Sequence, residues 1–265
     1  MNGAKTPLLE AEDISFSYET GKPVFSGVFF TLDAGEIYTI LGANGAGKST
    51  LLACLQGMLP PGSGTIRLDG QDIRGISPGN FALKVGIVAQ AESLRFDFTV
   101  ADYLVLGRAP HIGMLKVPGK AEYKMAEHVM EQMRITHLAR KPMSQLSGGE
   151  KQQAQIARVL VQNPKLILMD EPANHLDYGN QIKVLKTIIR LAEEGIAVIL
   201  STHIPDHAIL LDARAGILDN EGRLTSGSAE EIVTQENLSR IYKTGMYMAY
   251  IPEIKRRACV ACNIR

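Results

Sequence analysis

The sequence predicts an α/β fold, with a core that contains a parallel sheet, an antiparallel β subdomain at the N-terminus and an inserted α-helical subdomain. Short apolar runs rich in β-branched residues alternate with amphipathic stretches, which is the pattern of a parallel sheet covered by helices. One such run, residues 36–41, leads through a glycine-rich loop into an apolar helix start. The stretch from Gln90 to Ser144 is instead mostly helical in pattern. We therefore expect a single domain over residues 1–265, with the helical subdomain at roughly 91–160.

Composition and charge exclude several classes of protein. Of the 265 residues, 45% are hydrophobic and 21% are charged, as in ordinary globular proteins. The 28 Lys and Arg residues balance the 28 Asp and Glu residues, so no overall field favours nucleic acid as a partner. No apolar run approaches the ~20 residues of a membrane-spanning helix, and the first residues lack the layout of a signal peptide. We expect any membrane role to come through a partner.

The N-terminal part reads as strands around a first helix. Residues 8–17 and 24–32 have strand character and are separated by a short turn, with Tyr18 just before that turn. Residues 60–64 break the helix that starts near residue 51. Further strands are predicted over residues 65–70 and 85–89, and a brief helix opens at Ser77 and Pro78 between them.

The helical region has two specific signals. Thr99, with Asp102 three residues later, resembles a capping box at a helix start. In residues 121–135, Met125, Val129 and Met133 recur at helical spacing. We predict that this methionine stripe packs in a core, which is its more common role than lining a binding groove.

The remaining chain returns to alternating strands and helices. Strands are predicted over residues 166–169, 196–200 and 215–218, and the last of them forms a hairpin with residues 223–225. Helices are predicted over residues 151–162, 178–194, 228–231 and 236–242. We expect residues 243–265 to be a mobile tail in which Cys259 and Cys262 have no further metal ligands and no redox setting.

The glycine-rich loop matches the phosphate-binding pattern G-x-x-x-x-G-K-[ST]. Its residues are Gly42, Ala43, Asn44, Gly45, Ala46, Gly47, Lys48 and Ser49, followed by Thr50. A strand, a glycine loop and a helix in this order place backbone N–H groups and a helix N-terminus around an anion. We expect Lys48 to reach the β- and γ-phosphates of a nucleoside triphosphate and the Ser49 hydroxyl to bind Mg²⁺.

Polar residues follow several predicted strands at their carboxyl ends, where ligands gather in parallel sheets. They are Gln90, Asp170, Glu171 and His203. Adjacent carboxylates on one strand end point in different directions, so Asp170 suits Mg²⁺, through water, and Glu171 suits a general base. A helix-capping Asp beside a solvated Glu is the alternative, and the nearby phosphate loop argues against it.

Ser147, Gly148 and Gly149 precede a long amphipathic helix and form a second cradle for an anion, with free N–H groups at the positive end of the helix dipole. A flexible helix cap is the alternative. Two cradles of one chain cannot hold the same γ-phosphate from opposite sides. A two-fold dimer, in contrast, would supply each ATP with one cradle from each subunit.

Together these motifs resemble the ATP-binding cassette (ABC) ATPases over almost the whole chain. Residues 42–50 correspond to the Walker A loop, residues 146–150 to the signature motif and residues 166–171 to Walker B. The resemblance implies the core of a P-loop nucleoside triphosphatase. It also implies a homodimer in which two chains sandwich two ATP molecules head to tail.

The resemblance also implies roles for individual residues. Gln90 would be the Q-loop glutamine, which contacts nucleotide and Mg²⁺; Asp177 would lie in the D-loop, and His203 would be the switch histidine. Tyr18 falls where the family places the aromatic residue that stacks on adenine, although its position alone favours a surface aromatic. Ser147, Gly148 and Gly149 of one copy would contact the γ-phosphate held by Lys48 of the other.

Within that family the chain resembles the ATPases of importers for siderophore-iron, haem or cobalamin. The cues are residues 106–111 and the tail pattern of residues 236–242, while Ala173 departs from the usual threonine. The implied protein lies at the cytoplasmic face of the cell membrane and works with permease subunits and, indirectly, a substrate-binding protein. Importers of molybdate, tungstate or metal ions stay open, as does a soluble ABC ATPase. Glu171 argues against a module that binds ATP without hydrolysis.

Residues 90–114 are the expected surface for permease docking. The segment carries the apolar residues Leu94, Phe96, Phe98, Ile112 and Met114. A permease helix seated in a groove here would move when the ATP dimer closes. The alternative is that these side chains pack the helical subdomain.

Overall fold

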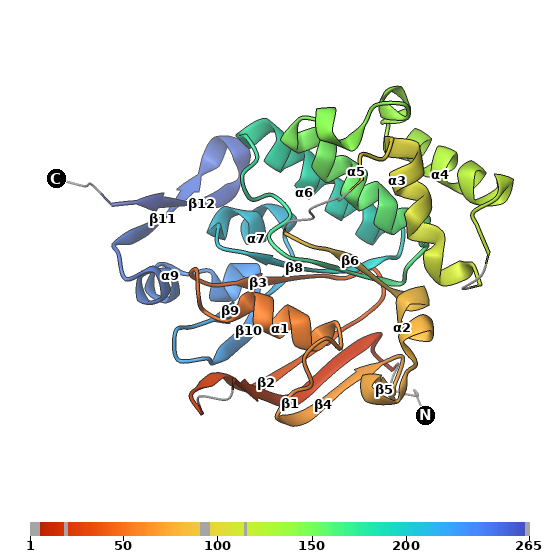
Figure 1. The fold of residues 1–265 in the computed structure, drawn as a ribbon. Helices are drawn as coiled ribbons and strands as arrows, with labels where there is room; N and C mark the ends of the chain where they lie inside the picture. Colours follow the sequence, from red (N-terminus) through yellow and green to blue (C-terminus); the bar gives the residue numbers. More distant parts are fainter. Residues whose placement is uncertain (1–5, 19–20, 91–95, 114–115, 263–265) are drawn as a thin grey trace, which may run out of the picture.

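The computed structural model describes residues 6–18, 21–90, 96–113 and 116–262. Within these residues, the central sheet has six strands in the order β10-β9-β3-β8-β7-β6 (Figure 1). All neighbours are parallel except β10, which pairs antiparallel with β9. The strands are β3 (Ile37–Leu41), β6 (Val85–Val88), β7 (Leu166–Met169), β8 (Ala197–Thr202), β9 (Arg214–Leu218) and β10 (Leu224–Ser228). The predicted parallel sheet and its terminal hairpin are confirmed.

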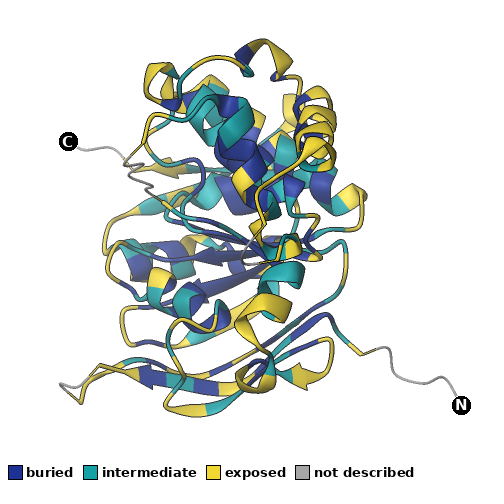
Figure 2. Ribbon diagram, turned by 45° about the vertical axis from the view of Figure 1, so that its right-hand side comes forward, coloured by how far each residue is buried: buried dark blue, intermediate teal, exposed yellow. Residues whose placement is uncertain are grey.

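The inner strands of this sheet end close together at their carboxyl ends. Leu41 pairs with Thr202, and Met169 pairs with both Leu200 and Val88. Strands β7 and β8 are buried along their whole length (Figure 2), because a parallel sheet is covered on both faces. Polar residues that follow these strands therefore meet at one edge of the sheet.

The N-terminal strands form a separate antiparallel sheet of order β2-β1-β4-β5, as the sequence predicted. Helix α1 (Lys48–Leu55) lies between this sheet and the central one (Figure 1). One hydrophobic cluster joins all three layers through Phe30 of β2, Leu52 of α1 and Ile40 of β3. The strands are β1 (Leu9–Ser17), β2 (Pro23–Leu32), β4 (Ser63–Leu68) and β5 (Gln71–Asp72). The packing fixes the position of α1 and hence of the loop before it.

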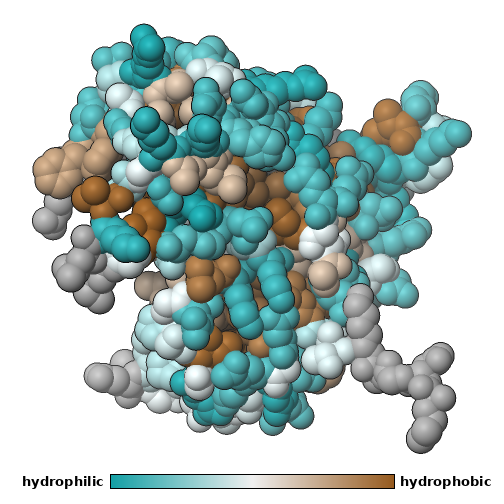
Figure 3. Space-filling view, turned by 90° about the vertical axis from the view of Figure 1, so that its right-hand side faces the viewer, coloured by the Kyte–Doolittle hydropathy of each residue, from teal (hydrophilic) through white to brown (hydrophobic). Residues whose placement is uncertain are grey.

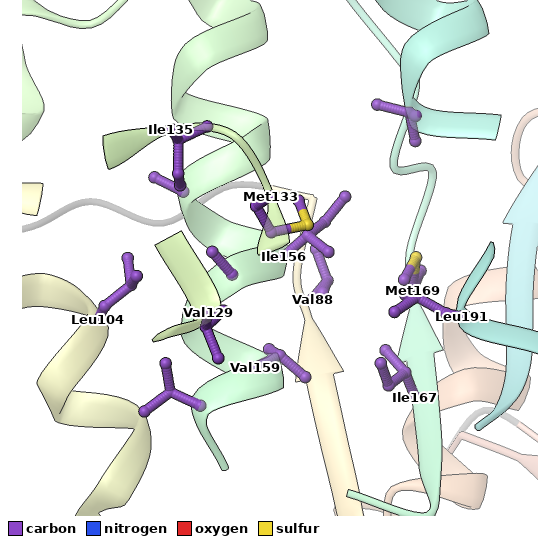
Figure 4. Close-up of a cluster of buried hydrophobic side chains, with 14 of the residues drawn as sticks. Val88, Leu104, Val129, Met133, Ile135, Ile156, Val159, Ile167, Met169 and Leu191 are labelled. Carbon is purple, nitrogen blue, oxygen red and sulfur yellow. The ribbon is translucent and has the colours of Figure 1, made fainter. Parts of the chain in front are cut away.

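Helices cover the opposite face of the central sheet. In Figure 4, Leu104, Val129 and Ile156 from three helices pack towards Val88 of β6 and Met169 of β7. The helices on this side are α3 (Val100–Val105), α4 (Lys120–Gln132), α5 (Gly148–Val161) and α6 (Tyr178–Glu193), with 3₁₀ turns η2 (Leu106–His111), η3 (Thr136–Leu138) and η4 (Met143–Gln145).

The predicted methionine stripe is only partly correct. Val129 and Met133 are buried in the cluster of the helical face, whereas Met125 is 37% exposed. Helix α4 packs on α3 and α5, and its buried residues are Ala126, Val129 and Met130. The predicted caps are present, because the hydroxyls of Thr99 and Ser77 accept N–H bonds at the starts of α3 and of α2 (Pro78–Lys84).

The prediction of a mobile tail is wrong for most of its length. Strands β11 (Met246–Ile251) and β12 (Arg256–Ala261) form an antiparallel hairpin joined by η5 (Pro252–Ile254). Its inner side chains Met246, Met248 and Cys259 pack on the cluster of the C-terminal helices. The basic residues 255–257 and the free cysteines Cys259 and Cys262 do not indicate a strand by themselves, so the sequence did not predict this hairpin. The remaining elements are η1 (Ile73–Gly75), α7 (Pro205–Leu211), α8 (Ala229–Ile232) and α9 (Gln235–Tyr242).

Candidate functional site

The phosphate loop connects the carboxyl end of β3 to α1. The N–H of Gly42 donates to the carbonyl of Thr202, so the loop starts beside the end of β8. A Cβ on Gly42 would lie 2.6 Å from the Leu218 carbonyl oxygen, and Gly47 has a φ of 99°, which side chains rarely allow. The first N–H groups of α1 have no acceptor within the helix and are available to an anion.

Lys48 and Glu171 form a buried ion pair beside this loop. Lys48 Nζ lies 3.3 Å from Glu171 Oε1, and the two side chains are only 4% and 10% exposed. The ammonium also donates to the carbonyl oxygens of Gly42 at 2.9 Å and Ala43 at 3.0 Å. These bonds offset part of the cost of burying the charge. The structure thus brings the lysine of the loop against the predicted general base.

The second oxygen of Glu171 is held from two other directions. The Asn174 amide donates to Oε2 at 2.9 Å, and His203 Nδ1 lies 3.1 Å from the same oxygen. A carboxylate held at both oxygens has a fixed orientation. Lys48, Glu171 and His203, which the sequence predicted from three separate motifs, are therefore in direct contact through one carboxylate.

Ser201 at the end of β8 links the two acidic residues. Its hydroxyl donates to Asp170 Oδ1 at 2.6 Å and accepts from the Glu171 N–H at 2.9 Å. Glu171 has a φ of 47°, in the left-handed region. Sequence reasoning missed Ser201 and the contact of Asn174. The available signals were a hydroxyl residue ending a buried apolar strand and an amide three residues after Glu171.

Tyr18 lies beside the first turn of α1. Its hydroxyl is 3.2 Å from Thr50 Oγ1, and its ring meets Phe16 edge-on with the centroids 5.0 Å apart. The side chain is 53% exposed. A planar ring that is held next to a phosphate loop and accessible to solvent can stack on a base.

Two predicted residues with oxygen donors lie at the same edge of the sheet. Gln90 follows β6 and is exposed, and the Val88 carbonyl of β6 accepts from the Asp170 N–H. Gln90 and Asp170 therefore leave neighbouring strands. Ser49, the second residue of α1, is exposed as well.

Ser147, Gly148 and Gly149 begin α5. The Ser147 hydroxyl accepts from the Glu150 N–H, and the Glu150 carboxylate accepts from the Ser147 N–H and hydroxyl. These bonds to Ser147 lower the pKa of Glu150 to about 2. A Cβ on Gly149 would lie 2.5 Å from the Asn180 side chain, so a larger residue here would force Asn180 at the start of α6 to shift.

Asp177 caps the neighbouring helix, because its carboxylate accepts from the Asn180 N–H at 2.9 Å. Within the described ranges, Ser147, Gly149 and Asp177 make their contacts at the starts of α5 and α6 rather than with the phosphate loop. The predicted site residues thus divide into two groups, one around Lys48 and one at these two helix starts.

Comparison with known protein families identifies the class of protein that has this arrangement of site residues. The model of the ABC transporter family matches residues 25–174, a stretch that contains the phosphate loop, Gln90, the start of α5 and Glu171. The chain belongs to the ABC transporter family. It is an ATP-binding protein of that family and an ATPase. Among the described residues, no helix of this ABC ATPase has the length and apolarity to cross a membrane.

Several relatives of this ABC ATPase are similar over most of their length. An ABC transporter ATP-binding protein of Haemophilus influenzae is 41% identical over 91% of both chains. The molybdate import ATP-binding protein MolC of the same organism is 33% identical over 90% of this chain and 89% of its own. The hemin import ATP-binding protein HmuV of Bordetella avium is 35% identical over 88% of this chain and 91% of its own.

A solved structure supports the same assignment. It shows an inward-facing conformation of a putative metal-chelate type ABC transporter, with 31% identity and a TM-score of 0.87. The match covers 98% of this chain and 99% of that chain. The α/β fold with its antiparallel N-terminal sheet and inserted helices is therefore the fold of this ABC structure.

Proposed function

We propose that this ABC ATPase is the ATP-hydrolysing subunit of an importer that couples ATP binding and hydrolysis in a head-to-tail homodimer to transport through a membrane permease. The contact of Lys48, Glu171 and His203 carries the proposal, since it joins a phosphate-binding cation to an oriented carboxylate. The chain acts as one nucleotide-binding domain, peripheral to the cytoplasmic face of the membrane.

ATP binds across the phosphate loop. The backbone N–H groups of residues 42–50 and the Lys48 ammonium hold the phosphates, because several donors converge there with a positive charge. Tyr18 stacks on the adenine from its place beside the start of α1.

The residues fit Mg²⁺ by their donor chemistry. The Ser49 hydroxyl, the Gln90 amide oxygen and the Asp170 carboxylate are oxygen donors, which Mg²⁺ prefers, and few protein ligands suffice because phosphates and water complete its shell. No cluster of three or more His, Cys, Asp or Glu residues suited to a metal occurs in the described residues. When bound, Mg²⁺ neutralises charge that develops on the phosphate oxygens.

Glu171 is the general base. Its carboxylate lies beside the ammonium that holds the phosphates, so a water bound to it is close to the γ-phosphate. Glu171 accepts the proton of this water as the water attacks. Asn174 and His203 keep the carboxylate oriented by holding its second oxygen.

The second group of site residues completes the site of the partner subunit. Ser147, Gly148 and Asp177 are exposed at the starts of α5 and α6. The packing of Gly149 on Asn180 fixes these two helix starts relative to each other. In a head-to-tail dimer, the N–H groups at the start of α5 contact the γ-phosphate bound by the partner.

The permease docks near the start of the helical subdomain. Phe96 and Leu106 are 71% and 41% exposed, and a cavity of about 280 Å³ beside Leu106 is lined by Ala109 and Ile112. Figure 3 shows this side of the molecule, on which hydrophobic residues lie at the surface between hydrophilic ones. Leu94 and Met114 lie outside the described residues, and Phe98 packs partly into the core of the helical face.

The proposed cargo is a metal chelate, that is, siderophore-iron, haem or cobalamin, delivered by a substrate-binding protein. The hemin import relative and the metal-chelate type structure support this class. The molybdate import relative, which has nearly the same identity, favours molybdate as the second candidate.

Uptake measurements test the proposal. A strain that lacks this gene is supplied in turn with labelled haem, siderophore-iron, cobalamin or molybdate, and complemented with wild type or Glu171→Gln. Wild type should restore uptake of one metal chelate and the variant should not. If wild type restores the uptake of molybdate alone, the cargo is molybdate and not a metal chelate. Unchanged uptake of all four, with ATP hydrolysis by the purified protein, would favour a soluble ATPase.

A further inference from the structure

The C-terminal helix reaches the backbone of the proposed switch histidine. Tyr242 ends α9, and its hydroxyl donates to the carbonyl oxygen of His203 at 2.7 Å. The side chain of the same His203 contacts Glu171 Oε2. Tyr242, which belongs to the tail pattern of residues 236–242, is therefore linked to the proposed general base Glu171 through one residue, His203.

Tyr242 is itself held in place. Leu238 and Ile241 of α9 are buried in the C-terminal cluster. The Asn220 amide donates to the Ile241 carbonyl at 3.2 Å and so satisfies one of the last carbonyls of the helix. The ring that carries the hydroxyl is thus fixed by packing and by backbone bonds on α9.

The segment that contains His203 is also held on its other side. Thr202 Oγ1 accepts from the Ile204 N–H at 3.1 Å and lies 3.0 Å from Nδ1 of the buried His207. In the first turn of α7, Asp206 accepts from the Cys259 N–H of the C-terminal hairpin at 3.1 Å. With the backbone of residues 202–207 fixed in this way, the His203 side chain has little freedom beyond its own rotamers.

We propose that Tyr242 is a positioning residue for ATP hydrolysis: its hydroxyl fixes the carbonyl of His203, so that the imidazole stays against the Glu171 carboxylate. The inference rests on the function proposed above for His203 and Glu171. It gives the C-terminal helix a role in the hydrolytic step that acts through the backbone of His203.

The chemistry of the hydroxyl supports this role. Burial raises the pKa of Tyr242 well above its usual value, and the nearby Cys259 and Glu171 raise it further. The group therefore stays protonated over the working pH range and remains a donor to a carbonyl, which can only accept.

The test is Tyr242→Phe, which keeps the packed ring and removes only the hydroxyl. The full-length variant should lose about 3- to 10-fold in kcat for ATP hydrolysis, with KM for ATP and nucleotide affinity unchanged. Tyr247→Phe is the matched control, because Tyr247 is 55% exposed on the hairpin, and it should behave as wild type. A fall in thermal stability or ATP affinity without a fall in kcat would overturn the inference.

A double variant separates positioning from general stability. In the His203→Ala background, Tyr242→Phe should cause no further loss of kcat, because its effect passes through His203. An equal fold-loss in both backgrounds would contradict the inference. If His203→Ala lowers kcat for ATP hydrolysis but Tyr242→Phe does not, only the proposed role of Tyr242 is wrong. If wild type does not hydrolyse ATP, or His203→Ala hydrolyses it normally, the proposed function fails as well.

Discussion

Glu171 Oε1 lies 3.3 Å from Lys48 Nζ, although the two residues follow different strands of the central sheet. Strand β8 lies between those strands; its Ser201 contacts Asp170 Oδ1, and His203, just after the strand, contacts Glu171 Oε2. The parallel register therefore assembles a compact group of charges from three strand ends. The effects of changing these residues follow from that arrangement.

Glu171→Gln should bind MgATP and hydrolyse it about 10²–10⁴ times more slowly, because the amide keeps the size of the side chain and loses the base. ATP-bound dimers should then accumulate. Phosphate release and size-exclusion chromatography with ATP measure the two effects. Near-normal turnover would exclude Glu171 as the general base.

Lys48→Ala is the informative comparison, because it should weaken ATP binding itself. It also leaves the Glu171 carboxylate without its cation in a buried site, so the free energy of unfolding should fall by about 3 kcal/mol. Adding Glu171→Gln to Lys48→Ala should recover part of that stability in urea denaturation. If the double variant recovers no stability, the contributions of Lys48 and Glu171 to the free energy of unfolding are independent.

Ser147→Arg should abolish hydrolysis while the monomer keeps its ATP affinity, because in the proposed dimer Ser147 acts on the nucleotide of the partner. The substitution also removes the N-cap of α5, which costs about 1 kcal/mol. Ser228→Arg removes the same capping box from α8 and is the control. Loss of ATP binding by monomeric Ser147→Arg would contradict the shared site.

Mixing Ser147→Arg with Lys48→Ala tests the head-to-tail arrangement directly. A heterodimer has one site that lacks both elements and one site that is intact. The mixture should therefore hydrolyse more ATP than either variant alone. Activity no higher than that of the parents would argue against composite sites.

Phe96→Asp should leave the ATP hydrolysis of the isolated subunit unchanged and abolish its co-purification with the permease, because an exposed apolar contact gains a charge. The exposed Phe96 is a cleaner probe than the partly buried Phe98. Phe29→Asp, at a 58% exposed phenylalanine of the N-terminal sheet, is the control and should co-purify normally. If Phe96→Asp co-purifies normally with the permease, the permease docks on another surface of the subunit.

His207 should make stability depend on pH. Burial lowers its pKa from 6.5 to about 4; the neighbouring His203 adds to this lowering, and Asp206 opposes it. The unfolded chain therefore binds a proton first as the pH falls, so stability is unaffected above pH 6.5 and is lost between pH 6.5 and about 4. The slope reaches about 1.4 kcal/mol per pH unit.

Urea denaturation at several pH values measures this dependence. His207→Gln should flatten the curve in that range, because glutamine does not titrate. His137→Gln, at an exposed histidine of η3, is the control and should keep the slope of wild type. If His207→Gln keeps the slope of wild type, other titrating groups dominate the pH dependence of stability in that range.

Elements whose sequence pattern spans only a few residues could be predicted from the sequence. The run of residues 36–41, the phosphate loop and Lys48 carry their spacing within a few residues, and the turn at residues 219–222 indicates its hairpin in the same way. Glu171 and His203 were predictable as strand-end residues, because apolar runs mark where strands end. The sequence by itself thus determined the fold class and the candidate residues of the site.

Only the tertiary structure decided which of these residues meet and what holds them. Ser201 carries no motif, yet register places its hydroxyl between Asp170 and the Glu171 N–H. The contact of Tyr242 with His203 joins a C-terminal helix to the end of β8, and the hairpin of residues 246–261 is held by packing that a basic, cysteine-containing stretch does not indicate. Such contacts join residues that are far apart in the chain and meet only when the strands align and the helices pack, so no pattern within a few neighbouring residues indicates them.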